Sequence, residues 1–264
     1  MSFFNVGFVI FPELTQLDFT GPQQVLARLP GSAMHIIAKS AAPVPSDSGL
    51  GLVPTHTFAD CPRLDLICIP GGGAGVVRAM GDAETIEFVR QQSQTARYVT
   101  SVCTGAFILG VAGLLKGRRA TTHWAYTELL PLVGAIPERS RIVKDGNVIT
   151  AGGVTAGIDF GLSIAAEIAG ETVAQAIQLS IEYDPVPPFD AGHPDRAPNT
   201  VKDAVFPRYE NARAAFRDGL ARMAVVCQPS RRSPIQYPLR RSSAGCERLS
   251  RRRDFRPSIW GRRS

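Results

Sequence analysis

The sequence predicts an α/β protein with a doubly wound, mostly parallel sheet sandwiched by helices. Three observations predict this fold class. Short, almost wholly apolar runs are typical of strands buried on both faces. Amphipathic segments of helical length lie between them, and glycine- or proline-rich turns mark the junctions. Because strands that alternate with helices form parallel sheets covered on both faces, we expect this sandwich to occupy about residues 1–185.

The first half of the sandwich begins with a buried strand. Residues 5–11 form a continuous apolar run. A helix start follows at Thr20, where a threonine cap precedes a Gly-Pro pair. Residues 34–38 predict a second strand, and residues 45–58 alternate with Gly and Ser in the manner of a hairpin.

The next strand and helix lead to the centre of the chain. Residues 65–69 predict another buried strand, which closes with the glycine-rich loop 70–75. A helix is expected over about 82–94, followed by a strand at 98–102. The remaining expected elements are a hairpin of 141–143 with 148–151, helices over 155–169 and 171–183, an arm or linker over 185–198, and a short helix near 202–223.

Cys103 stands where the strand 98–102 changes into a helix of small residues. Ser101 and Gly105 lie two positions on either side, which is the spacing of a nucleophile elbow. Such a turn exposes Sγ at a helix N-terminus, where unpaired N–H groups and the helix dipole favour the thiolate. A buried core cysteine is the alternative, but the switch from strand to helix favours a nucleophile.

Other candidate residues follow neighbouring strands. Ligands bind at the carboxyl ends of strands in open α/β sheets. The N–H groups of Gly71 and Gly72 are therefore expected to face developing negative charge together with the N–H group of Thr104. Asp18, just past the first strand, is either a helix cap or a carboxylate of the site. A phosphate-binding loop is disfavoured because neither of the usual glycine motifs is present.

Two further polar residues have alternative interpretations. His123 is a candidate base or substrate-binding residue for Cys103, but beside Trp124 it is equally a packing or cap residue. Asp159 lies among apolar helix positions, where a structural hydrogen bond is the expected role.

The composition excludes several classes of protein. Hydrophobic residues make up 44% of the chain without an apolar run of bilayer length, and no basic segment precedes the first strand, so we expect a soluble, cytoplasmic protein. The five cysteines show neither an even count nor a C-x-x-C pair, which leaves a disulfide framework and a zinc site unsupported.

The positive charge is confined to the C-terminal segment 225–264. This segment carries eleven Arg against two acidic residues, so residues 1–224 have a net charge of −3 although the whole chain has +6. Without helical or strand periodicity, the segment is expected to be a disordered tail after an α/β domain of residues 1–224. Its composition also fits translation of a GC-rich region out of frame. Nucleic-acid binding is not expected, because charge runs are usually solvated.

Several motifs resemble the ThiJ/PfpI superfamily of class I glutamine amidotransferase-like, flavodoxin-like folds, over about residues 3–220. They are, in chain order, QLDFTGP at 16–22, IPGGG at 69–73, SVCTGAFIL at 101–109, GLLKGRRATTHW at 113–124 and ITAGGVTAGID at 149–159. Many members carry Glu where this chain has Asp18. The aspartate, with Thr104 after the cysteine, resembles the isonitrile hydratase branch.

The resemblance implies a function and a set of roles. Cys103 is implied as nucleophile, Asp18 as its acid/base partner and Thr104 as a supporting residue. The implied reaction is hydration of an isonitrile, a small-molecule substrate, to an N-substituted formamide through a thioimidate. A homodimer without a metal or organic cofactor is also implied.

Other functions remain open within the same superfamily. A ligand-sensing domain fused to an AraC-type DNA-binding module is one, but the tail lacks the length and periodicity of such a module. A stress-response thiol protein or glyoxalase-like carbonyl enzyme needs only an oxidisable or nucleophilic Cys103. A peptidase needs a well-placed base, for which His123 is the candidate.

Overall fold

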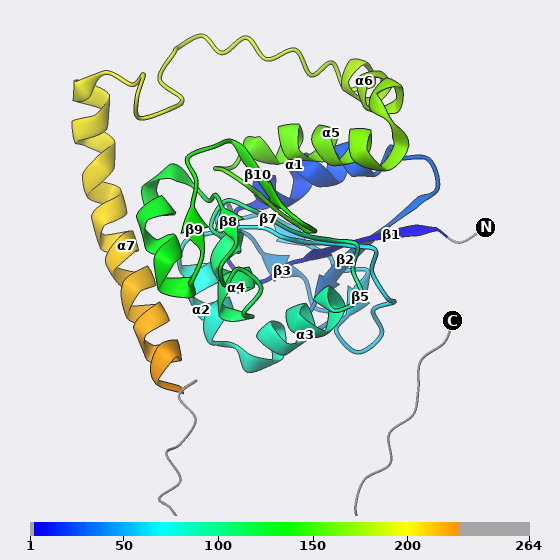
Figure 1. The fold of residues 1–264 in the computed structure, drawn as a ribbon, viewed down its shortest axis with the longest axis horizontal. Coiled ribbons are helices and arrows are strands. Elements are labelled where there is room, and N and C mark those ends of the chain that lie inside the picture. The colour runs from blue at the N-terminus through cyan, green and yellow to red at the C-terminus, as the bar shows by residue number, and fades with distance from the viewer. Residues whose placement is uncertain (1–2, 227–264) are drawn as a thin grey trace, which may run out of the picture. The chain divides into compact units, whose positions relative to one another are not determined.

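The computed structural model describes residues 3–226, and its centre is a seven-stranded sheet with the order β10-β11-β7-β6-β1-β2-β5 (Figure 1). All neighbouring strands pair in parallel except β10 and β11. The strands of this sheet are β1 (Phe4–Val9), β2 (Ser32–Ala38), β5 (His56–Thr57), β6 (Leu66–Ile69), β7 (Tyr98–Val102), β10 (Ile142–Asp145) and β11 (Val148–Ala151). The doubly wound, mostly parallel sheet predicted from the sequence is confirmed.

Helices cover both faces of the sheet. The helices are α1 (Gln16–Leu26), α2 (Ala74–Gly81), α3 (Ala83–Ser93), α4 (Gly105–Val111), α5 (Ala156–Ala169), α6 (Glu171–Ser180), α7 (Asn199–Val226) and the 3₁₀ helix η1 (Trp124–Val133). On one face α1 packs against α5, which also contacts α6, and on the other lie α2, α3 and α4 (Figure 1). The long helix α7 packs against α2 and η1.

Two pairs of short strands lie outside the main sheet. β3 (Val44–Pro45) and β4 (Gly51–Leu52) form an antiparallel pair, while β8 (Arg119–Ala120) and β9 (Ile136–Pro137) pair in parallel. The hairpin expected within 45–58 is therefore present, but its last residues form β5 and join the main sheet beside β2. The hairpin of β10 and β11 is confirmed.

The start of the first helix differs from the sequence expectation. The helix begins at Gln16 and contains Thr20, whose hydroxyl donates to the Gln16 carbonyl one turn earlier (3.1 Å). Thr20 is thus an interior residue, and the N-cap position belongs to Thr15. The Gly-Pro pair misled the prediction because Pro22 lies inside the helix, where proline is uncommon.

Three helical segments were not fully predicted. α2 begins within the glycine-rich segment that we expected to be a loop, and η1 follows a stretch without clear periodicity. The last helix extends over 28 residues, and Phe216 and Leu220 anchor it in the core. Residues 185–198 lack regular secondary structure, as expected for an arm.

The tail prediction falls mainly on residues 227–264, which lie outside the described residues, so the domain boundary at residue 224 stays a prediction. None of the helices within 3–226 is both long and apolar enough to cross a membrane.

Candidate active site

The site lies at the topological switch point of the sheet. β1 stands between β6 and β2, so the chain leaves β1 toward one edge and later returns to β1's other side. Asp18 follows β1, Gly71 follows β6, and Cys103 follows β7. Because these strands are parallel, their carboxyl ends meet at one edge, which is where open α/β sheets bind ligands.

Cys103 adopts the strained turn of a nucleophile elbow. Its φ of 56° lies in the left-handed region that is costly for a residue with a side chain. The Cys103 N–H donates to the carbonyls of Ala151 (3.0 Å) and Gly152 (2.9 Å), and its carbonyl accepts from the Thr122 hydroxyl (2.7 Å). These three bonds hold the turn in place.

The helix after the elbow packs closely against the end of the neighbouring strand β6. A Cβ atom at Gly105 would overlap the carbonyl oxygen of Ile69 at the end of β6. Only glycine allows this approach, which confirms the physical reason for a small residue two positions after Cys103.

Asp18 is fully buried beside the cysteine and is not a helix cap. It is the third residue of α1, and its Oδ2 accepts from the Gly71 N–H (3.0 Å). Oδ1 makes no well-aligned hydrogen bond with any residue of the described chain. Burial raises the pKa of Asp18 to about 7, although the nearby Cys103 thiol and the Gly71 N–H lower it. The carboxyl group can therefore hold a proton near neutrality.

The Cys103 thiol is also buried, with 6% of the residue exposed. Burial is the largest effect that raises the pKa of Cys103, and the negative charge of Asp18 raises it further. The backbone N–H groups of Val154 and Thr104 act in the opposite direction. The sequence predicted a thiolate because the helix N-terminus lowers the pKa of a cysteine. In the structure, burial and an ionised Asp18 raise the pKa of Cys103 by more than the backbone N–H groups lower it. The Asp18 carboxyl group and the Cys103 thiol are therefore expected to share a single proton.

Gly71 separates the two reacting groups with almost no free space. A Cβ atom there would lie 2.7 Å from Asp18 Oδ2, 2.7 Å from the Thr104 nitrogen and 2.8 Å from Cys103 Cβ. The three predicted site residues Asp18, Cys103 and Thr104 thus surround Gly71. Its own N–H group is used to hold Asp18 and is not free for substrate.

Gly72 has a different role from the one expected. Its N–H donates to the Thr104 hydroxyl (2.9 Å), and the same hydroxyl donates to the Gly72 carbonyl (2.7 Å). The Gly72 N–H is therefore not available as an oxyanion donor, which corrects the sequence expectation. The structure instead places the N–H groups of Thr104 and Val154 at the sulfur of Cys103.

Val154 is a site residue that the sequence analysis missed. Its φ of 28° is unusual for a β-branched side chain and turns its N–H toward Cys103. The only signal in the sequence was the preceding Gly152-Gly153 pair, which permits a tight loop after β11.

His123 is a packing and cap residue in this structure. Its Nδ1 accepts from the Ala125 N–H at the start of η1 (3.2 Å), and burial lowers the pKa of His123 to about 4. Its ring packs against Trp124 and Tyr209, with centroids 5.3 and 5.2 Å away. The neutral ring lines a pocket, and no hydrogen bond joins it to Cys103.

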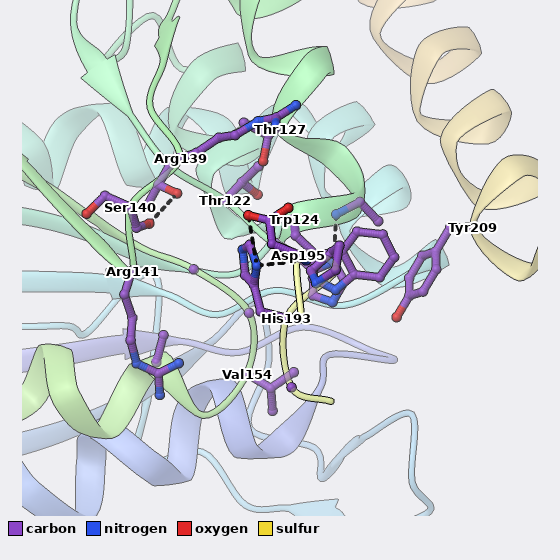
Figure 2. A pocket seen from close by; sticks show the side chains of 18 of the residues that line it. Thr122, Trp124, Thr127, Arg139, Ser140, Arg141, Val154, His193, Asp195 and Tyr209 are labelled. Carbon is purple, nitrogen blue, oxygen red and sulfur yellow. Dashed lines mark hydrogen bonds and ion pairs between the residues drawn. The ribbon is translucent and has the colours of Figure 1, made fainter. Parts of the chain in front are cut away.

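The pocket that His123 lines is a cavity of about 590 Å³, which we call the elbow pocket (Figure 2). Trp124 and Tyr209 stand on one side of it, Arg139 and Arg141 on the other, and His193 of the arm lies between them. Cys103 and Asp18 do not line the pocket themselves. They lie behind its wall, because Thr122, Gly152 and Val154 line it and each contacts Cys103 through a hydrogen bond.

Asp159 makes structural interactions as predicted, but at a half-exposed position. Its carboxylate pairs with Arg141 and accepts from the Tyr183 hydroxyl (3.0 Å). Nowhere in residues 3–226 do three or more His, Cys, Asp or Glu side chains gather in a way that could hold a metal ion.

Comparisons with known proteins identify relatives of this chain. The chain is 58% identical to the isonitrile hydratase of Pseudomonas putida over 199 residues, which are 75% of this chain and 87% of that protein. The crystal structure of a ThiJ/PfpI family protein from Pseudomonas syringae has a TM-score of 0.81 and 44% identity, covering 83% of this chain and 91% of that one.

A more distant relative is a transcriptional regulator. The HTH-type regulator GbdR of Pseudomonas aeruginosa is 26% identical over 190 residues, which are 68% of this chain and only 51% of the regulator. The model of the DJ-1/PfpI family matches residues 5–167, which include Asp18, Gly71 and Cys103. This match, and the similarity over most of the chain to the two Pseudomonas proteins, show that the chain belongs to the DJ-1/PfpI family.

Proposed function

We propose that the protein hydrates isonitriles to N-substituted formamides, with Cys103 as nucleophile and Asp18 as its acid/base partner. The observation that carries this proposal is the buried Asp18 carboxyl, with a pKa of about 7, beside the elbow thiol. Support also comes from the 58% identity to the Pseudomonas putida isonitrile hydratase. The reaction needs a nucleophile for the terminal carbon and an acid that protonates it, and this pair supplies both.

The first step uses the proton shared by the pair. Asp18 takes the thiol proton as the sulfur of Cys103 bonds to the terminal carbon of the isonitrile. Asp18 then delivers that proton to the same carbon, so the product is a neutral thioimidate, Cys–S–CH=N–R. The N–H groups of Thr104 and Val154 stabilise the sulfur while it carries negative charge.

The second step consumes one water molecule. The Asp18 carboxylate accepts a proton from water while the water oxygen adds to the thioimidate carbon. Asp18 then passes this proton to the imine nitrogen. The tetrahedral adduct then breaks its C–S bond. The hydroxyl proton of the adduct returns to the Asp18 and Cys103 pair. The formamide leaves with the oxygen of the water as its carbonyl oxygen and the other water proton on its nitrogen.

The test is formamide production from cyclohexyl isonitrile by the wild type and three variants. Cys103→Ser and Asp18→Asn are expected to lose turnover, because each removes one half of the proton-sharing pair. Cys61→Ser is the matched control, since Cys61 is a free, half-buried thiol that does not contact the site. Full activity in folded Asp18→Asn would refute the paired roles.

Failure of the wild type to hydrate any isonitrile would favour the other activities that the sequence left open. Turnover of methylglyoxal would then indicate a glyoxalase-like enzyme, and oxidation of Cys103 without turnover would indicate a stress-response thiol protein. A role in transcriptional regulation needs a DNA-binding module, and the match of this chain to the HTH-type regulator GbdR spans half of that regulator.

The proposal includes a homodimer in the cytoplasm that acts on a small molecule without a metal or organic cofactor. The elbow pocket has a volume suited to a small molecule. Sedimentation of the full chain at micromolar concentration tests the dimer, and residues 1–224 expressed alone test the proposed domain.

A further inference from the structure

Helix α7 presents a regular stripe of side chains to the rest of the protein. Residues spaced alternately three and four apart share one face of a helix. In α7 this face carries Phe206, Tyr209, Arg213, Phe216 and Leu220. The first three line the elbow pocket, and the last two are buried in the core. Arg213 is thus the one charged residue in an otherwise apolar or aromatic stripe.

Arg213 has unused binding capacity. Its Nε atom is buried and has no hydrogen-bond partner among residues 3–226, and no acidic side chain in that range pairs with it. Two other arginines of the pocket are paired, Arg141 with Asp159 and Arg196 with Asp190. A buried donor without a partner costs free energy, so a leucine or phenylalanine would stabilise the stripe better unless the charge binds a ligand.

The other charges of the pocket leave room for an anion. Arg139 also lines it and makes no ion pair within the described residues. The acidic side chains of the lining are Glu128, which is exposed, and Asp195, which pairs with His193 of the arm (3.3 Å). Arg213 and Arg139 therefore remain available to a negatively charged group.

Arg213 lines the same pocket as Thr122 and Gly152, which form hydrogen bonds with Cys103 behind the pocket wall. Burial and the charges of Cys103 and Tyr209 raise the pKa of Tyr126 to about 12, whereas Arg213 lowers it. Arg213 and Cys103 are therefore both within electrostatic range of one phenol group.

One part of the pocket wall is aromatic. The ring centroid of Tyr209 lies 5.2 Å from that of His123 and 5.1 Å from that of Trp124, whose side chain faces Tyr209 in Figure 2. Flat rings stack favourably on such a surface.

Resting on the proposed function, we propose that the elbow pocket selects isonitriles whose substituent is a flat ring bearing a carboxylate, and that Arg213 binds this carboxylate. Arg213 then determines substrate specificity, while Cys103 and Asp18 perform the reaction. The product of such a substrate carries an N-formylamino group and the carboxylate on the same ring.

The experiment compares two substrates of nearly equal size, 4-isocyanobenzoate and its methyl ester. The wild type is expected to hydrate the carboxylate with a kcat/KM about 10- to 100-fold higher than that for the ester, as expected for a hydrogen-bonded ion pair. Arg213→Gln is expected to lose this preference, mainly through KM for the carboxylate, and to keep its activity toward the ester. Arg217→Gln, on the exposed face of α7, is the matched control and keeps the preference.

Each outcome has a distinct meaning. Hydration of both substrates without a preference overturns the role of Arg213 and leaves the proposed function intact. An equal loss of both activities in folded Arg213→Gln also overturns it. If this variant does not fold, Arg213→Met, which keeps the apolar stem, takes its place. Hydration of neither substrate by the wild type, with cyclohexyl isonitrile also inert, overturns the proposed function and this inference together.

Discussion

The carboxyl group of Asp18 and the thiol of Cys103 lie within hydrogen-bonding reach of one another, buried behind the wall of the elbow pocket. The neutral thiol favours ionisation of Asp18, whereas the ionised carboxylate makes ionisation of Cys103 more costly, because burial removes water that would otherwise screen the charges. The pair therefore behaves as one acid with two steps of proton loss. The first two predictions follow from this relationship.

The activity is expected to depend on pH through the proton count of the pair. At low pH both groups are protonated, and Asp18 cannot accept the thiol proton. The acid limb of kcat/KM is therefore expected near pH 7, the pKa of Asp18. At high pH both groups lose their proton, and no acid remains for the isonitrile carbon. Initial rates from pH 5 to 9 measure the acid limb, and the alkaline limb is expected above this range because the pKa of Cys103 is raised. A flat profile from pH 5 to 9 would contradict the prediction.

The stability of the fold is expected to fall with rising pH through the same carboxyl group. The pKa of Asp18 is raised to about 7 in the folded chain, against 3.8 for an aspartate exposed to water, so the folded state binds the proton more tightly. Between these values the folded state holds a proton that the unfolded state has lost, and ionisation destabilises the fold as the pH rises.

Asp18→Asn removes this dependence. Relative to the wild type, the variant is expected to gain up to about 4 kcal/mol in unfolding free energy between pH 4 and 7. Urea denaturation at a series of pH values measures the difference. Asp184→Asn, which changes an exposed carboxylate, is the control. Parallel stability curves for Asp18→Asn and the wild type would contradict a raised pKa.

Gly71→Ala is expected to damage both stability and activity. The added methyl group would lie 2.7 Å from Asp18 Oδ2 and from the Thr104 nitrogen, so these groups must move apart. We expect a loss of about 1–3 kcal/mol in unfolding free energy, with a large decrease in kcat. Gly73→Ala is the matched control, because nothing lies within 4 Å of its added atom. Equal effects of the two substitutions would show that the close approach at Gly71 is unimportant.

Thr104→Val is expected to destabilise the loop after β6. The hydroxyl both accepts from and donates to Gly72, and its removal leaves two buried backbone groups without partners. The expected cost is about 1–3 kcal/mol in unfolding free energy. Thr104→Ser restores the hydroxyl and should recover most of the stability and activity. Thermal unfolding and kcat measured on both variants test this, and a valine variant as stable as wild type would contradict it.

The sequence predicted the positions of Asp18 and Cys103 because a simple rule governs them. Each follows a buried strand, and parallel strands bring their carboxyl ends to one edge of the sheet. The elbow was recognisable from the small residue at Gly105, which the close approach to Ile69 requires. These features depend on local pattern and topology, both of which the sequence contains.

Other parts of the site depend on contacts that no local pattern reveals. The Gly72 N–H was expected to bind substrate, but the Thr104 hydroxyl, which is distant in sequence, occupies it. The strained backbone of Val154 follows from packing of its loop against Cys103, and only the preceding glycines hinted at it. The start of α1 was misjudged because Pro22, normally a sign of a first turn, lies inside the helix.

The residues that perform the reaction and those that shape the pocket come from different parts of the chain. Asp18, Gly71 and Cys103 belong to the strand ends of the sheet, whereas Tyr209 and Arg213 belong to α7, beyond the residues that the family model matches. Substitutions on the inner face of α7 can therefore alter the range of compounds accepted while the reactive centre stays unchanged. Relatives with the same elbow are expected to diverge in substrate through this helix, which makes it the first place to redesign the enzyme.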